Sequence, residues 1–147
     1  MINVYTEGRI NNDYDNFIDD VIMAIFPEDA KYDIYIEAKK FVDKDGTHAG
    51  FCTGDELESV ISVATHWVFE DGEEIAYEPH EMASNLAHEL VHAKQFCRGQ
   101  INMVDNVWKH NNLVLDCDHV DYIDLPWEVE AYGYETILTD IYWGNDQ

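Results

Sequence analysis

The stretch NLAHELVHAKQF, residues 85–96, contains two histidines spaced four residues apart, with a glutamate directly after the first. In an α-helix this spacing places His88 and His92 one turn apart on the same face, close enough for both imidazoles to bind one metal ion. Glu89 lies about 100° around the helix from His88, so it would face a water on the metal rather than the metal itself. The alternative is that all three are ordinary polar residues on the exposed face of an amphipathic helix.

The motif lies within a predicted helix that runs from about Pro79 to Cys97. Proline is favoured at the first helical position, and Gly99 is suited to end the helix. Small and aliphatic residues gather on the side opposite the motif, namely Ala83, Leu86, Ala87, Leu90 and Val91. We therefore expect the helix to bury that side against a sheet and to present the motif on its other side.

The remaining pattern predicts one α+β domain that spans residues 1–147. Segments 2–5, 32–38 and 58–70 have the composition of strands, and 13–26 and 126–143 have helical spacing. Segment 100–125 is polar and irregular, which indicates a loop or hairpin. We expect a small mixed or antiparallel sheet packed on the motif helix, followed by a second, C-terminal helix that bears glutamates.

Charge and composition exclude several classes of protein. Eight basic residues against 31 acidic ones give a net charge of −23, which repels nucleic acids and anionic membranes. This charge leaves open a protein that mimics DNA, and it suits a protein that binds cations. We see no apolar run of about 18 residues and no signal peptide. Three cysteines at unrelated spacings indicate a reducing compartment, so we expect a cytoplasmic protein.

A catalytic zinc site needs a third protein ligand, and the last predicted helix offers Glu130. On a helical projection Glu130 shares its side with apolar residues, namely Trp127, Ala131, Tyr134, Ile137, Leu138 and Ile141, whereas Glu128 and Glu135 fall on the other side. A carboxylate in a buried stripe needs a cationic partner, and no Lys or Arg follows Lys109. We therefore predict Glu130 as the third ligand. The alternative is that Glu130 accepts hydrogen bonds from the backbone or a tyrosine.

The sequence HELVH, followed on a later helix by EVEAYGYE (128–135), resembles the gluzincin group of zinc metallopeptidases. In that group the third ligand is a glutamate on a second helix, usually directly before an alanine. The compact size and the strands ahead of the motif resemble the smallest members, the minigluzincins, and small putative metallopeptidases of bacteria and bacteriophages. The resemblance is specific over residues 85–96 and 126–135 and only architectural elsewhere.

This resemblance implies one Zn²⁺ per chain bound by His88, His92 and Glu130, with Glu89 as the general base. It also implies a peptide or protein substrate that lies along an edge strand, which we expect at 61–69. Many gluzincins carry an aspartate four residues after the ligand glutamate, where it orients the first histidine. Here that position is Tyr134, which would accept less well from an imidazole or donate to a reaction oxyanion instead. The sequence does not choose between Tyr134 and the other candidates for that oxyanion, Tyr122, Tyr132, His110 and His119.

Two functions follow as hypotheses. The first is a zinc-dependent metallopeptidase in which Glu89 activates a water on the zinc, so that peptide bonds are hydrolysed. The second is a noncatalytic acidic interaction module, for example a DNA mimic, in which a zinc ion is structural. Neither the substrate nor the oligomeric state can be read from the sequence.

Overall fold

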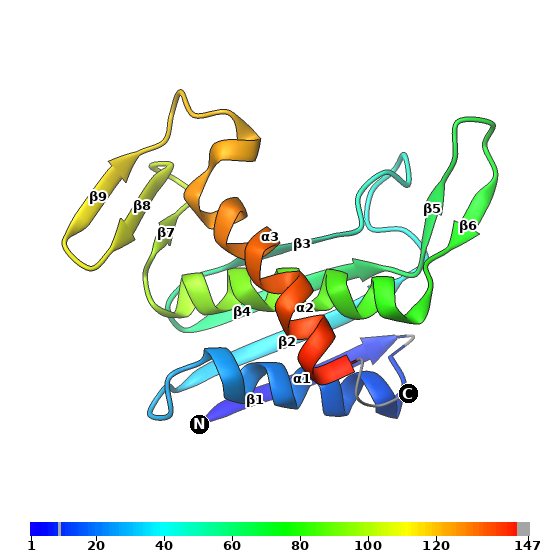
Figure 1. The fold of residues 1–147 in the computed structure, drawn as a ribbon, viewed down its shortest axis with the longest axis horizontal. Helices are drawn as coiled ribbons and strands as arrows, with labels where there is room; N and C mark the ends of the chain where they lie inside the picture. The colour runs from blue at the N-terminus through cyan, green and yellow to red at the C-terminus, as the bar shows by residue number, and fades with distance from the viewer. Residues whose placement is uncertain (9, 144–147) are drawn as a thin grey trace.

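A computed structural model describes residues 1–8 and 10–143 of the chain and has an α+β architecture (Figure 1). Its strands and helices follow one another as β1 (Ile2–Gly8), α1 (Asn12–Ile25), β2 (Tyr32–Lys39), β3 (Gly50–Gly54), β4 (Glu58–Ala64), β5 (His66–Val68), β6 (Glu74–Ala76), α2 (Pro79–Cys97), β7 (Ile101–Asn102), β8 (Val107–His110), β9 (Leu113–Asp116) and α3 (Pro126–Leu138). A 3₁₀ turn, Tyr122–Asp124, precedes α3, and a π-helical segment, Thr139–Trp143, continues it. The motif helix α2 has the predicted bounds.

The main sheet has four strands in the order β1-β2-β4-β3. Strands β1, β2 and β4 are parallel, and β3 runs antiparallel to β4 at the edge. The sheet is therefore mixed. Helix α2 contacts both β4 and β3, and Figure 1 shows it lying along them. The motif helix is thus held beside the antiparallel edge of the sheet.

The core lies between one face of this sheet and the helices α1 and α2. In β2 the residues that alternate along the strand divide as the sequence predicts, because Ile34 and Ile36 are buried whereas Tyr35 is exposed. The buried side chains of α1 and α2 join the same cluster, including Phe17, Ile18, Val21, Leu86, Leu90 and Val91. Packing this apolar face against the sheet fixes the rotation of α2, and hence the direction in which its other face points.

The prediction that residues 61–69 form an edge strand is wrong. This segment divides into β4, which lies inside the sheet between β2 and β3, and β5, which leaves the sheet to pair with β6. Residues 61–64 are all buried, as the position of β4 inside the sheet requires. The edge strand beside the motif helix is β3.

The segment predicted as a loop or hairpin forms a three-stranded sheet in the order β7-β8-β9. A second, smaller hydrophobic cluster lies beneath it, formed by Phe96, Ile101, Trp108, Cys117 and Trp127. This cluster joins the end of α2 to the start of α3 and so fixes where α3 begins. No helix in the described part of the chain is long and apolar enough to cross a lipid bilayer.

Two glycines give a matched test of how α2 ends. Gly99 follows α2 with φ of 66°, and a Cβ there would lie 2.9 Å from a Glu56 oxygen; Gly133 lies inside α3 with open space around it. We expect Gly99→Ala to lower the free energy of unfolding by about 1–2 kcal/mol, because alanine is strained in this conformation. Gly133→Ala should raise it by about 0.5–1 kcal/mol. Urea unfolding measures both, and equal effects would contradict the assigned helix end.

Candidate metal centre

Helix α2 presents His88 and His92 towards α3 rather than towards solvent. Both are buried, at 8% and 7% exposure, and their Nε2 atoms lie 3.1 Å apart. A polar helix face in water would leave both rings exposed, so the alternative of an ordinary solvated face does not hold for these two residues. Their spacing of four residues places both rings at one point between the helices.

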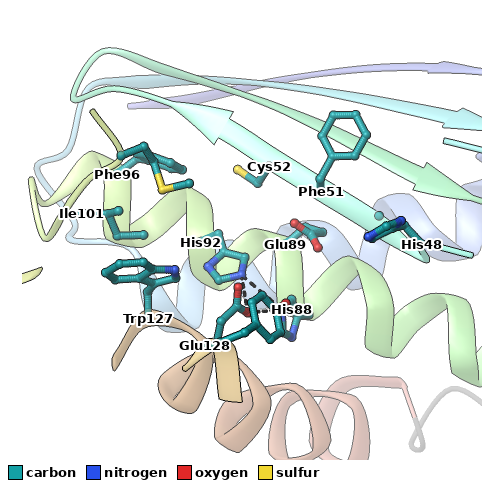
Figure 2. A pocket seen from close by; sticks show the side chains of 13 residues that line it. His48, Phe51, Cys52, His88, Glu89, His92, Phe96, Ile101, Trp127 and Glu128 are labelled. Carbon is teal, nitrogen blue, oxygen red and sulfur yellow. Dashed lines mark hydrogen bonds and ion pairs between the residues drawn. The ribbon is translucent and has the colours of Figure 1, made fainter. Parts of the chain in front are cut away.

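Glu128 of α3 completes the group. Its Oε1 lies 3.0 Å from His88 Nε2 and 3.1 Å from His92 Nε2, and the carboxylate is buried at 7% exposure. Figure 2 shows the carboxylate of Glu128 next to the rings of His88 and His92. Three ligand atoms bound tetrahedrally at 2.0–2.1 Å to one ion stand about 3.3 Å apart, close to the separations found. These residues can therefore hold a metal ion.

The structure corrects the predicted third ligand, because Glu130 points away from the histidines. Its Oε1 accepts from Lys94 Nζ at 2.5 Å and from Gln95 Nε2 at 3.1 Å. The cationic partner of Glu130 is Lys94 of α2, which is distant in the sequence, and not a residue close to Glu130 in the sequence. Two positions along a helix differ by about 200°, so only one of Glu128 and Glu130 can face the histidines.

The error arose from the apolar stripe of the last helix. Part of that stripe is exposed: Tyr134 and Ile137 of α3 at 46% and 51%, and Ile141 of the segment after it at 48%. The buried residues of α3 are Trp127, Glu128, Ala131 and Leu138. The helix therefore buries the part of the predicted stripe that adjoins Glu128 and leaves the part that adjoins Glu130 exposed.

The predicted catalytic role of Tyr134 is also wrong. Tyr134 lines a separate pocket with Val91, Lys94 and Arg98, on the side of α2 and α3 away from the metal group. Tyr132 lies four residues after Glu128, and its ring contacts His88 edge to face with centroids 4.6 Å apart. The position four residues after the ligand glutamate is thus Tyr132, which supports His88 by packing.

Both histidines are oriented through their other ring nitrogen. His88 Nδ1 donates to Glu135 Oε2 at 3.2 Å, and His92 Nδ1 donates to Gln95 Oε1 at 2.8 Å. In a neutral ring, a proton on Nδ1 leaves the lone pair of Nε2 directed at the shared point. This is the tautomer that a metal ligand requires. Glu135 thus fixes the orientation of the His88 ring.

Glu89 lies beside the group without belonging to it. It is 6% exposed, and its Oε2 has no hydrogen-bond partner among the described residues. Burial raises its pKa to about 7, although the nearby His92 and His88 act in the opposite direction. Gly50 of β3 lies directly over it, since a Cβ there would come within 3.4 Å of Glu89 Cγ. A carboxylate in this state can take up a proton near neutral pH.

The pKa values of His88 and Glu128 are shifted because the two side chains lie close together. Burial disfavours the imidazolium of His88, but hydrogen bonds to Glu128 and Glu135 outweigh it and raise the pKa to about 9. Burial likewise disfavours the Glu128 carboxylate, and the two histidines outweigh it and lower the pKa to about 2. In the metal-free protein a proton on His88 therefore offsets the charge that a metal ion would neutralise.

The group opens into a cleft formed by two adjoining pockets, one of which Figure 2 shows. His48, Gly50, His88, Glu89 and Tyr122 line both pockets. We call the apolar pocket the one lined further by Phe51, Cys52, Phe96, Ile101, Met103 and Trp127. The polar pocket is the one lined further by Thr47, Ala49, Asn85, Tyr132 and Glu135.

Of the other candidates for binding an oxyanion, Tyr122 is the one that lines both pockets. Burial and its hydrogen bond with Tyr132 hold the pKa of Tyr122 well above its usual value, so its hydroxyl keeps the proton. His110 is bonded to Gln100 Nε2 at 2.7 Å. Neither His110 nor His119 lines these two pockets.

Sequence reasoning missed Glu135, Gln95 and His48. Glu135 lies seven residues after Glu128, two helical turns along the same face, so choosing Glu128 as the ligand would have identified it. Gln95 follows His92 by three residues, which is the spacing of side-chain pairs on a helix. His48 lies in a loop, and no pattern in the sequence connects it with the motif.

Comparison of the chain with protein-family models, with curated proteins and with solved structures gave no match. What the site can do therefore follows from its own residues.

NMR titration of the metal-free protein tests the charges around His88. We expect its imidazole to titrate near pH 9 and, in Glu128→Gln, lower by roughly one to three units, because the opposite charge is removed while burial remains. Folding raises this pKa, so the stabilisation is complete below about pH 6.5 and is lost as the pH rises to about 9. Glu130→Gln is the control and should leave the His88 titration unchanged. A wild-type midpoint near 6.5 would contradict the assigned contacts.

Proposed function

We propose that the protein is a zinc-dependent metallopeptidase whose metal ligands are His88, His92 and Glu128. The observation that carries this proposal is the meeting of three ligand atoms, two imidazole nitrogens and one carboxylate oxygen, beside a buried carboxylate with an unpartnered oxygen. Two histidines and a carboxylate form a set of protein ligands found in catalytic zinc sites. A structural zinc site is usually closed by four protein ligands, and here three meet at the floor of a cleft.

The resemblance to gluzincins supports the same function once the third ligand is moved to Glu128. The chain then keeps HELVH on one helix and a glutamate on a second. It departs from the usual pattern at the next residue, since Val129 rather than an alanine follows Glu128. The small alanine of this helix is Ala131, which is fully buried against the core.

Zinc at this position supplies a Lewis acid that polarises a carbonyl and lowers the pKa of a water. Glu89 then has the part of a proton carrier. Its carboxylate takes a proton from the water that adds to the carbonyl carbon, and it delivers a proton to the nitrogen of the leaving amine as the peptide bond breaks. Tyr122 is the hydroxyl placed to donate to the oxygen on which negative charge develops.

Strand β3 gives a substrate chain a place to bind. It pairs with β4 on one side and forms the edge of the sheet on the other. An extended peptide can add to such an edge through backbone hydrogen bonds. Because Gly50 has no side chain, a peptide along β3 can come close to Glu89. We propose that the substrate is a peptide or protein segment in extended form.

Metal titration decides between the two glutamates. We expect wild-type protein to bind one zinc ion per chain and Glu128→Ala to lose most of its affinity, because a ligand is removed. Glu130→Ala should bind zinc within about tenfold of wild type, because Glu130 acts only through Gln95 and Lys94. Calorimetry or competition with a chelating dye measures both. Full affinity in Glu128→Ala would overturn the ligand assignment.

The substitution Glu89→Gln separates a peptidase from an interaction module with a structural metal. We expect the variant to keep zinc and to lose at least about a hundredfold in kcat for peptide hydrolysis, since glutamine cannot carry the proton. A library of quenched fluorescent peptides provides the assay. Glu130→Gln, which keeps the shape of a residue outside the cleft, is the matched control. Hydrolysis at the wild-type rate in Glu89→Gln would rule out this mechanism.

A further inference from the structure

The polar pocket contains two groups that the proposed mechanism does not use. They are His48, in the loop before β3, and Asn85, in α2 one turn before Glu89. Both can donate hydrogen bonds, whereas the carboxylates that line this pocket are those of Glu89 and Glu135. Figure 2 shows His48 at the end of the cleft away from Trp127.

The ring of His48 is held in place by Asp43. Its Nδ1 lies 2.8 Å from Asp43 Oδ2, and the same carboxylate accepts from Thr47 Oγ1 at 2.7 Å and from the Thr47 backbone N–H at 3.0 Å. These bonds keep the pKa of Asp43 well below its usual range. With Nδ1 donating to Asp43, Nε2 is the ring nitrogen left for a ligand, and it donates in the imidazolium form of the ring. The ring is 71% exposed, so the carboxylate rather than packing fixes its position at the entrance of both pockets.

Asn85 provides the second donor. Its Nδ2 is buried and has no hydrogen-bond partner among residues 1–8 and 10–143. A buried amide donor without a partner is unfavourable relative to a paired one. An acceptor that enters the polar pocket would remove this cost. The helical spacing of four residues places Asn85 on the same side of α2 as Glu89.

The charge of the cleft selects the kind of acceptor. Glu89, Glu128 and Glu135 surround the position of the metal, and a bound divalent cation would leave this group with one net negative charge. A carboxylate on a ligand would be repelled there, whereas a neutral carbonyl would not. We infer that His48 and Asn85 form a subsite for an uncharged carbonyl oxygen, that of a backbone amide next to the bond to be cleaved. This inference rests on the proposed peptidase function and adds the residues that hold the substrate chain at one side of the metal.

A pair of small hydroxamates isolates this interaction. N-acetylglycine hydroxamate and pentanohydroxamate share the group that binds zinc and have chains of equal length, but only the first has an amide carbonyl beyond that group. Calorimetry gives the dissociation constant of each with zinc-loaded protein. The ratio of the two constants reports the contribution of the carbonyl and cancels changes in affinity for the metal. Zinc content is measured for every variant.

In His48→Phe and in Asn85→Ala we expect the advantage of the carbonyl-bearing probe to fall by about three- to tenfold, the equivalent of one hydrogen bond. His48→Gln, which restores an N–H donor, should recover most of the loss. The matched controls are His80→Phe and Asn112→Ala, which replace exposed residues outside both pockets. Both controls should keep the wild-type ratio.

Ratios unchanged from wild type in both His48→Phe and Asn85→Ala, with one zinc per chain, would overturn the subsite and leave the metallopeptidase proposal standing. If His48→Phe no longer holds zinc, the ratio of the two constants in Asn85→Ala tests the subsite by itself, and an unchanged ratio there overturns it. Failure of zinc-loaded wild type to bind either hydroxamate would instead overturn the open metal centre, and with it the subsite.

Discussion

The contact on which the rest of the site depends is the carboxylate of Glu128 placed between two buried imidazoles. It joins α2, which is fixed by the core, to α3, which reaches that core through Ala131 and Leu138. A buried carboxylate is costly unless a positive charge meets it. Charge pairing and apolar burial therefore together decide which side of α3 is buried, and Tyr134 and Ile137 are left exposed.

Around this contact the polar groups are arranged in matched pairs. His92 donates to Gln95, and Gln95 donates in turn to the Trp127 carbonyl and to Glu130, which also accepts from Lys94. The network fixes the ring of His92 and satisfies both ends of a buried amide. In a chain with only eight basic residues against 31 acidic ones, a lysine at this position balances one of the carboxylates closest to the metal group. Lys94 thereby supplies the positive charge that Glu130 needs on the other side of the helix.

The sequence predicted the motif helix, the strands before it and the need for a carboxylate from the last helix, because these follow from periodicity and from metal chemistry. It did not predict which carboxylate, because apolar spacing was used to decide which side of α3 is buried. That rule fails where a ligand and its partners lie on the inner face, since polar residues then replace apolar ones there. The same rule led to the prediction that Tyr134 lies at the metal site, because Tyr134 shares the side of α3 that bears Glu130. The edge strand was missed because β3, GFCTG, is short and rich in glycine and threonine, and only the pairing of β4 on both sides shows that β3 is the edge.

The second hydrophobic cluster has a consequence for how tightly an ion can be held. Trp127 belongs to this cluster and is the residue directly before Glu128. Packing of β7, β8 and β9 therefore determines where Glu128, one of the three residues that could hold an ion, is placed, from outside the main core. A chain without this small sheet would keep all three ligands in its sequence but would have to order the start of α3 when the ion binds, at a cost in conformational entropy. Segment 100–125 thus gives the site its pre-organisation, the property that separates a strong chelator from a weak one with the same atoms.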